Sequence, residues 1–211
     1  MNILLYLSFM PEKIAKIISY IFHPLLMPTY ALLVLFNSGT YLQYMPQGPK
    51  AIIILLVFTG TFLIPVSLIP VFLYLGLTRS VYFYQRSERF IPLLITTLLY
   101  YFTFFFLRNN HLSAYILSIL LTGTISLLAA LLISVWWKIS LHMIGIGALV
   151  GYITGLIIRT GTAHLILFIV IIFIAGLLGT ARLVLKVHTG PQIYTGLFLG
   201  IITGFSTILL Y

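Results

Sequence analysis

Seven apolar segments, separated by short polar stretches, make up most of the chain. They cover residues 18–37, 52–75, 90–107, 114–136, 140–158, 163–180 and 191–210. Most are close to the roughly 20 residues that a helix needs to cross a ~30 Å hydrocarbon layer. A helix satisfies its own backbone hydrogen bonds in lipid, whereas loops and open strands do not. The pattern therefore predicts an all-α, polytopic membrane helix bundle with six or seven transmembrane helices.

Prolines interrupt the first two segments. Pro24 and Pro28 fall in the first segment, and Pro65 and Pro70 in the second. A proline inside a helix removes a backbone hydrogen bond and bends the helix, so we expect both segments to be kinked. The connections are short and no Ser- or Pro-rich linker is present, so residues 1–211 are predicted to form a single integral-membrane domain.

Glycines recur at every fourth position in two later segments. They are Gly147, Gly151 and Gly155 in one segment, and Gly196, Gly200 and Gly204 in the other. Small residues at this spacing lie along one helix face and allow two membrane helices to approach closely. Such packing would bring together the N-terminal ends of the two helices, where His142 and His188 lie.

Composition adds a strong positive charge to this picture. The chain is 62% hydrophobic and 6% charged, with a net charge of +9, and Glu12 and Glu88 are its only acids. A basic membrane protein suits anionic lipid headgroups or phosphate ligands, so the lipid bilayer and a phosphorylated membrane lipid are the expected partners. The scattered cations do not predict nucleic-acid binding. Without cysteine, and with two acids, no metal and no cofactor are expected.

Polar residues gather in three clusters: 78–89, 137–142 and 181–188. These clusters fall on one membrane face if successive segments alternate in direction. Basic residues are more numerous there than on the opposite face, which favours a cytoplasmic location. If the cations of these clusters bind a ligand and are left out of the count, the two membrane faces have nearly equal numbers of basic residues. The orientation of the protein in the membrane therefore stays open. We expect an integral protein of a bacterial inner (cytoplasmic) membrane, with a membrane partner protein or a homo-oligomer as a further possibility.

The clusters contain the parts of a phosphate site. His142 lies in the first turn of one segment and His188 just before another, and helix N-termini favour anions. Further positive charge would come from Arg182, Arg89, Arg86 and Lys138. Arginine offers a planar fork of donors that matches phosphate oxygens. Two histidines beside a phosphate suggest one as the nucleophile and the other as the acid for the leaving group.

The spacing of these residues resembles that of the type 2 phosphatidic acid phosphatase superfamily, which includes membrane lipid-phosphate phosphatases and the soluble vanadium haloperoxidases. The third motif of that family is Ser-Arg, five residues, His, three residues and Asp. Here Ala181-Arg182 is followed by five residues and His188, then by three residues and Gln192. The second motif, Pro-Ser-Gly-His, matches Ser140 and His142. The first, Lys, six residues and Arg-Pro, is matched more weakly: Arg79 and Arg86 keep its spacing, and Arg89 precedes Phe-Ile-Pro92.

The resemblance covers residues 79–204, which would form a phosphatase-like core behind two N-terminal spans in residues 1–75. It implies that His188 forms a phosphohistidine and that His142 gives a proton to the leaving alcohol. It also implies a phosphate clamp made by Arg182 with Arg86 or Arg89, and a hydrogen bond from Ser140 to a phosphate oxygen. Lys138 would add charge beside them.

Several departures from the family pattern affect the expected activity. The aspartate that orients the nucleophilic histidine is Gln192 here, which accepts a hydrogen bond but brings no charge. In serine proteases, replacing the comparable orienting aspartate with an amide lowers the catalytic rate by about 10⁴-fold. Ala181 replaces the serine of the third motif. Glu88 is a possible substitute for the missing carboxylate, although pairing with Arg86 or Arg89 is the favoured role.

Two functions from different classes remain open. One is a lipid-phosphate phosphatase acting on a phosphomonoester or diphosphate, and the other is a catalytically inactive relative that binds a phosphorylated lipid or acts as a scaffold in a membrane complex. A transporter or channel has little support, because no intramembrane acid relay is visible. His23 is expected to bond to backbone freed by proline rather than to reach the ligand. His111 and His164 are expected at the opposite interface, and residues 98–107 are expected to face lipid or core, with a lipid-chain path as the alternative.

Overall fold

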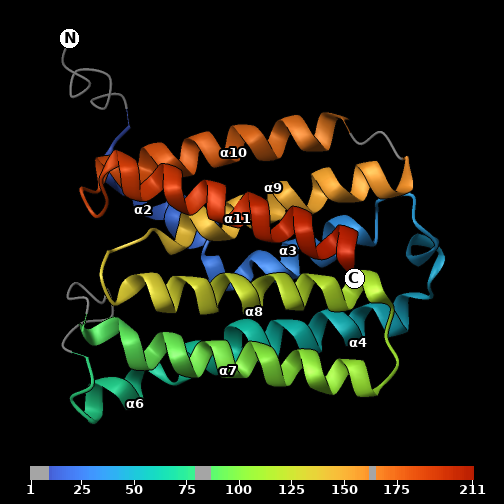
Figure 1. Ribbon diagram of the computed structural model, residues 1–211, viewed down its shortest axis with the longest axis horizontal. Coiled ribbons are helices and arrows are strands. Elements are labelled where there is room, and N and C mark those ends of the chain that lie inside the picture. The colour runs from blue at the N-terminus through green and yellow to red at the C-terminus, as the bar shows by residue number, and fades with distance from the viewer. Residues whose placement is uncertain (1–9, 79–86, 162–164) are drawn as a thin grey trace.

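The computed structural model describes residues 10–78, 87–161 and 165–211, and these residues form helices and connecting turns with no strand. Within these ranges, seven helical stretches are long and apolar enough to cross a membrane: Glu12–Leu35, Gln47–Tyr74, Glu88–Asn109, Ala114–Ser134, Leu141–Thr160, Leu165–Val184 and Gly190–Leu210. The prediction of an all-α membrane bundle is confirmed, with segment ends shifted by a few residues. Figure 1 shows the helices running side by side along the long axis of the molecule.

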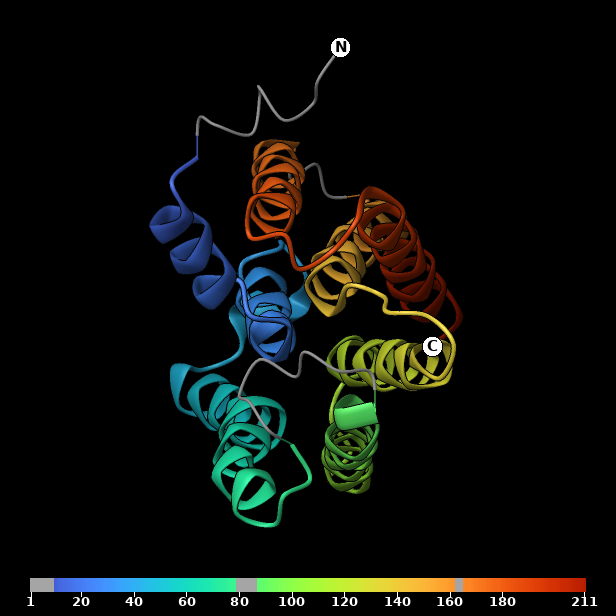
Figure 2. The same cartoon turned by 90° about the vertical axis from the view of Figure 1, so that its left-hand side faces the viewer.

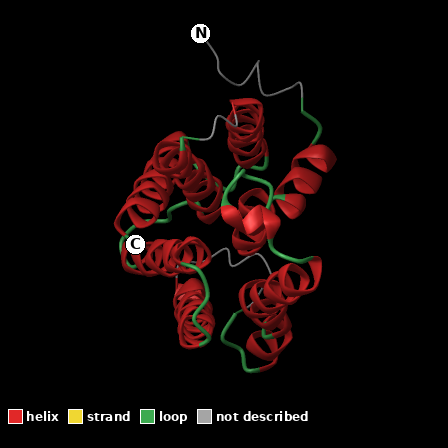
Figure 3. Cartoon of the chain, turned by 90° about the vertical axis from the view of Figure 1, so that its right-hand side faces the viewer, coloured by secondary structure: helices red, strands yellow, loops and turns green. Residues whose placement is uncertain are grey.

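The first span breaks into two helices, as its prolines predict. Helix α2 (Glu12–Ile21) ends before a 3₁₀ turn, η2 (Pro24–Leu26), and helix α3 (Met27–Leu35) continues. The break frees backbone groups, and side chains bind two of them: His23 Nδ1 accepts from the Leu25 N–H at 3.4 Å, and the Tyr30 hydroxyl donates to the Ile21 carbonyl at 2.7 Å. The end-on views show α3 near the centre of the bundle and α2 toward its outside (Figures 2 and 3).

The second span is broken twice. Helix α4 (Gln47–Phe58) passes into a π-helical turn, η4 (Thr59–Leu63), followed by the short helices α5 (Ile64–Ser67) and α6 (Ile69–Tyr74). Pro65 and Pro70 each lie in the first turn of the helix that follows a break, where a missing N–H costs little. At Gly60 the turn passes so close to Thr103 that a Cβ would collide with it. The expected kinks are confirmed.

The remaining spans are single helices: α7 (Ser87–Asn109), α8 (Ala114–Ser134), α9 (Leu141–Thr160), α10 (Leu165–Val184) and α11 (Gly190–Leu210). Helices α9 and α11 make the most extensive contact among the described elements and run parallel, because the glycines spaced four apart on each helix meet backbone or side chains at the matching height of the other. Added Cβ atoms at Gly147 and Gly151 would collide with the carbonyls of Leu197 and Ile201. The glycine-lined helix pair predicted from the sequence is confirmed.

Hydroxyl groups join α8 to α11 inside the bundle. Ser126 Oγ lies 2.7 Å from Thr203 Oγ1, and Thr122 hydrogen-bonds Thr207 one turn away. In lipid, such bonds between helices replace the hydrophobic attraction that water would supply. The outside of the bundle carries large apolar side chains such as Phe102, Phe106 and Ile166, as a lipid-facing surface requires.

Candidate functional site

A cavity of about 580 Å³ opens inside the bundle at the end where α9 and α11 begin. This is the left-hand end of the bundle in Figure 1. Its polar wall comes from α2, α7, α9, α10 and the two connections that precede α9 and α11. The charged and imidazole side chains that line it are Glu12, Lys16, His23, Arg89, Lys138, His142, Arg182 and His188. Five of these residues belong to the site predicted from the sequence, and the structure brings those five together: Arg89, Lys138, His142, Arg182 and His188.

His188 lies in the connection between α10 and α11, and its side chain is 8% exposed. Its Nδ1 lies 3.1 Å from Oε1 of Gln192, and the same oxygen accepts the Thr189 N–H at 3.1 Å. Because the Thr189 N–H donates to this atom of Gln192, the atom must be the amide oxygen and not the amide nitrogen. An amide oxygen only accepts, so Nδ1 of His188 must carry the proton. The lone pair of the imidazole is therefore on Nε2, the position of a nucleophile.

The surroundings of His188 keep it neutral. Its pKa is lowered from 6.5 to about 3, by burial first and then by repulsion from Arg182, Arg89 and Lys138, while the hydrogen bond to Gln192 acts in the opposite direction. A neutral imidazole keeps its lone pair available throughout the physiological pH range.

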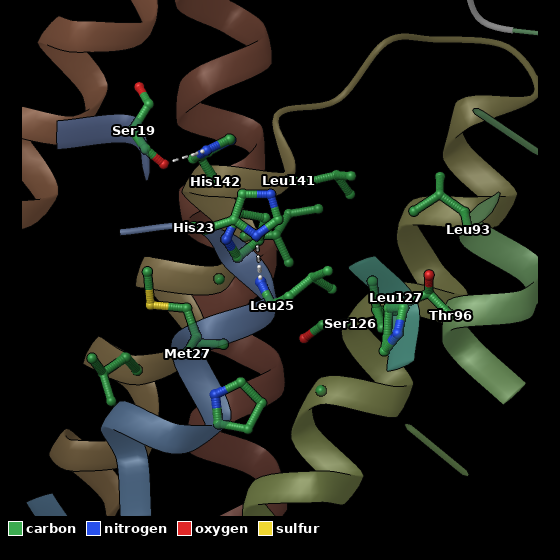
Figure 4. Close-up of a pocket in the computed structure, with 18 of the residues that line it drawn as sticks. Ser19, His23, Leu25, Met27, Leu93, Thr96, Ser126, Leu127, Leu141 and His142 are labelled. Carbon is green, nitrogen blue, oxygen red and sulfur yellow. Dashed lines mark hydrogen bonds between the residues drawn. The ribbon is translucent and has the colours of Figure 1, made fainter. Parts of the chain in front are cut away.

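His142 lies in the first turn of α9, and its Nε2 is 3.1 Å from the backbone carbonyl of Ser19 on α2. A carbonyl only accepts, so Nε2 of His142 donates and Nδ1 is the nitrogen left for ligand chemistry. His23 packs edge-on against this ring, with ring centres 5.7 Å apart. Figure 4 shows both imidazoles side by side, one bonded to Ser19 and the other to Leu25.

Arg182 is near the end of α10, and its Nη1 donates to Ser19 Oγ at 3.1 Å. Its Nε–H is buried and has no hydrogen-bond partner in the described part of the chain. A buried guanidinium N–H without an acceptor is costly, so an anionic ligand at this position would stabilise the site. Among residues 10–78, 87–161 and 165–211, no carboxylate forms an ion pair with Arg182.

Lys138 and Arg89 complete the positive end of the cavity. The pKa of Lys138 lies below its ordinary value because of partial burial first, and then because of repulsion from Arg89 and Arg182. This repulsion indicates that Lys138, Arg89 and Arg182 lie close enough to interact electrostatically. They face a common space, which therefore favours a multiply charged anion such as phosphate.

Three predicted site residues do not line the cavity, and a fourth falls outside the described residues. Ser140 is fully buried where α9 begins, does not line the cavity, and its hydroxyl has no partner among the described residues. Gln192 lies behind His188 and reaches the cavity only through it. Glu88 lies in the first turn of α7 and does not line the cavity. Arg86 is outside the described residues, as is Arg79.

The N-terminal span supplies site residues that the sequence prediction missed. Ser19 contacts both His142 and Arg182, and His23 lines the cavity while also binding backbone as expected. A signal for them exists in the sequence. Polar residues recur at helical spacing in this otherwise apolar segment. They are Glu12, Lys16, Ser19 and Tyr20 on the cavity side of α2, and His23 just beyond the end of that helix.

Comparison of the chain with protein-family models, with curated proteins and with solved structures finds no match. The described residues contain no group of three or more His, Cys, Asp or Glu side chains placed to hold a metal ion. The fold and cavity define an integral-membrane helical protein with three histidines at the polar end of an internal, positively charged cavity.

Proposed function

We propose that this chain is a lipid-phosphate phosphatase-like membrane protein, a divergent member of the type 2 phosphatidic acid phosphatase superfamily, in a bacterial inner membrane. It hydrolyses a phosphomonoester or diphosphate of a lipid through a phosphohistidine on His188. The observation that carries the proposal is the convergence of three cations on His188 and His142, with the buried Nε–H of Arg182 lacking an acceptor.

The first chemical step follows from the hydrogen bonds of His188. Its Nδ1 proton points to Gln192, so Nε2 attacks phosphorus and forms the N–P bond as the bond from phosphorus to the leaving oxygen breaks. Arg182, Arg89 and Lys138 neutralise the charge on the phosphoryl oxygens. His142, protonated at Nδ1, gives that proton to the leaving alkoxide while its Nε2–H stays on the Ser19 carbonyl.

The second step returns the enzyme to its starting state. His142, now neutral at Nδ1, takes a proton from water, and the resulting hydroxide attacks phosphorus. The N–P bond breaks, inorganic phosphate leaves, and His188 recovers its lone pair on Nε2. No other co-reactant than water is needed.

Gln192 favours a second candidate function. An amide orients His188 but does not stabilise the positive charge that develops on the ring as the N–P bond forms. A site with this substitution retains phosphate binding more readily than turnover. The alternative is therefore a protein that binds a phosphorylated lipid without hydrolysing it.

Phosphate release from purified protein separates these functions. The substrates are phosphatidate, a polyprenyl diphosphate and a lipid-A-like phosphate, each in nanodiscs. The variants are His188→Asn and Gln192→Asp, with His111→Asn as the matched control. His111 lies in the turn after α7 with a backbone φ of 55°, which asparagine tolerates well.

Release that His188→Asn abolishes and His111→Asn preserves would support the phosphatase. Binding without release by the wild type, with release by Gln192→Asp, would support the binding protein. Release that is unchanged in His188→Asn would overturn the proposed nucleophile.

A further inference from the structure

The cavity extends far beyond its charged end. On α9 its lining runs from His142 through Gly145 and Leu149 to Tyr152, always on one helix face. Ten residues at 1.5 Å rise give a depth of about 15 Å, which is half of the ~30 Å hydrocarbon layer. On α7, lining residues from Arg89 to Tyr100 cover a similar length. The cavity therefore reaches from the membrane surface to about the middle of the bilayer.

In the deep part of the cavity, each hydroxyl contributed by the described residues has a hydrogen-bond partner. The hydroxyls along its wall are already bonded: Thr96 donates to the Pro92 carbonyl at 2.7 Å, and Ser126 pairs with Thr203 at 2.7 Å. The Tyr152 hydroxyl donates to the Tyr115 carbonyl at 2.7 Å. With their hydrogen bonds satisfied by protein, these groups do not need water, so the wall suits hydrocarbon better than an aqueous path.

The far end is closed by the core. Ile119, Leu149 and Tyr152 line the cavity at its greatest depth and are 3%, 6% and 1% exposed. Partway along, the wall is tightly packed at two glycines: a Cβ at Gly145 would approach Met27 Cγ to 2.9 Å, and one at Gly123 would approach the Tyr100 ring to 2.7 Å. The space is thus a narrow sleeve with a definite bottom.

The volume fits one chain. If a methylene group takes about the ~30 Å³ of a water molecule in the liquid, then about 580 Å³ holds on the order of twenty heavy atoms. The phosphate and its ester oxygen use part of that space. The remainder accommodates one chain that reaches about half-way across the bilayer.

We propose that the deep cavity binds the hydrocarbon chain of a single-chain lipid phosphate, with the phosphate held among the cations at its mouth and the chain end against Ile119. This inference rests on the proposed function for its headgroup. Lipid tails are as apolar as the cavity wall, so a chain gains little free energy on leaving the bilayer. Length selection therefore comes from the closed end, and chains that reach beyond Ile119 are rejected.

The test uses straight-chain alkyl phosphates of increasing length, and a two-chain phosphatidate, presented to the protein in nanodiscs. Binding is measured by native mass spectrometry and turnover by phosphate release. The variants are Ile119→Phe, which shortens the sleeve, and Ile119→Ala, which lengthens it. Ile125→Phe and Ile125→Ala are the matched controls, because Ile125 lies on the same helix and is 39% exposed on its outer side.

The expected wild-type profile is flat up to a limiting length, then falls at least tenfold, with the two-chain lipid bound tenfold or more weakly than the best alkyl phosphate. Ile119→Phe moves the limit to shorter chains and Ile119→Ala to longer ones, whereas both Ile125 variants keep the wild-type limit. Retained binding of the shortest alkyl phosphate shows that each variant is folded. Failure of Ile119→Phe to fold leaves the shift in Ile119→Ala as the deciding result.

The two proposals fail separately. A limit on the alkyl chain length that binds, without phosphate release, would support the proposed chain-binding cavity and overturn the proposed phosphatase activity. Phosphate release with the same length profile in wild type and both Ile119 variants would overturn the sleeve and sustain the phosphatase.

Discussion

Ser19 supplies acceptors to two site residues from one turn of α2. Its carbonyl accepts from His142 Nε2, and its hydroxyl accepts from Arg182 Nη1 while donating to the Ala15 carbonyl at 2.9 Å. The backbone contact survives any side-chain substitution, whereas the hydroxyl contact does not. The two interactions can therefore be separated by mutation.

Ser19→Ala should weaken substrate binding more than turnover. A hydrogen bond to a charged group contributes about 1.5–3 kcal/mol, so we expect KM to rise roughly 10- to 100-fold with little change in kcat. Ser19→Thr, which keeps the hydroxyl, should restore KM. Kinetics on a lipid phosphate in nanodiscs measure both. Equal KM values for Ser19→Ala and wild type would show that Arg182 does not depend on this contact.

Gln192→Asp should make His188 more basic and more reactive. A carboxylate at this position stabilises the imidazolium, so the pKa of His188 should rise from about 3. We expect faster phosphate release, by ten-fold or more, and a histidine titration visible by NMR at higher pH than in the wild type. An unchanged titration would show that residue 192 does not face the imidazole in solution.

The low pKa of His188 also links protonation to stability. Between pH 6.5 and about 3, the unfolded chain binds a proton at this histidine and the folded chain does not. The free energy of unfolding should therefore fall as pH is lowered, by up to about 2 kcal/mol from pH 6.5 to pH 5. Thermal unfolding in detergent should show a smaller loss over this range in His188→Gln. A loss of the same size in both proteins would exclude His188 as its source.

At the scale of the helices, the α9–α11 pair fixes the distance between the two histidines. A Cβ at Gly200 would meet the backbone of Ile144 and Ala148, which has no room to move without separating the helices. Gly176, on α10, has open space around it. An alanine at Gly200 therefore tests the close packing of the helices, and an alanine at Gly176 measures the effect of helix propensity alone.

Gly200→Ala should lower the thermal unfolding temperature, since overpacking costs roughly 1–3 kcal/mol or more when backbone must shift. Gly176→Ala should leave it unchanged or raise it slightly, because alanine is the better helix former by about 1 kcal/mol. Both are measured in the same detergent. Equal stability of the two variants would contradict the close approach of α9 and α11.

Local patterns in the sequence predict most of the elements. Apolar length predicts the spans, proline predicts the breaks, and the glycine spacing predicts that α9 and α11 pack closely, because each of these is a property of one segment. The docking of α2 against α10 is different. That docking depends on which helix faces come together in the fold. For this reason the sequence prediction did not include Ser19, whereas it included Arg182 and His188.

For the whole molecule, the alternation of spans predicts that the three polar clusters share one end. The side chains of these clusters that line one cavity there are Arg89, Lys138, His142, Arg182 and His188. The depth of that cavity was not predictable. The depth depends on lining residues that several helices contribute. Within the aromatic run at residues 98–107, the residue that lines the cavity is Tyr100. Phe104 and Leu107 of that run are buried in the core, and Phe102, Phe105 and Phe106 are on the outside.

Anion binding should stabilise the whole fold, whether or not the protein is an enzyme. Phosphate at 100 times its dissociation constant adds about 2.7 kcal/mol to the free energy of unfolding. We expect inorganic phosphate to raise the unfolding temperature of the wild type and to have little effect on Arg182→Gln. Chloride at equal ionic strength is the control for screening. An equal rise in the variant would mean that the phosphate binds away from Arg182.

The break between α2 and α3 has a mechanical consequence. Helix α2 packs mainly against α10, and it joins α3 through the turn at His23 and Pro24 rather than through continuous helix. Force applied to the N-terminal end of the chain is therefore not transmitted rigidly into the core. It reaches Ser19 first, so His142 and Arg182 lose their common anchor while the α9–α11 pair still holds the two histidines at a fixed spacing.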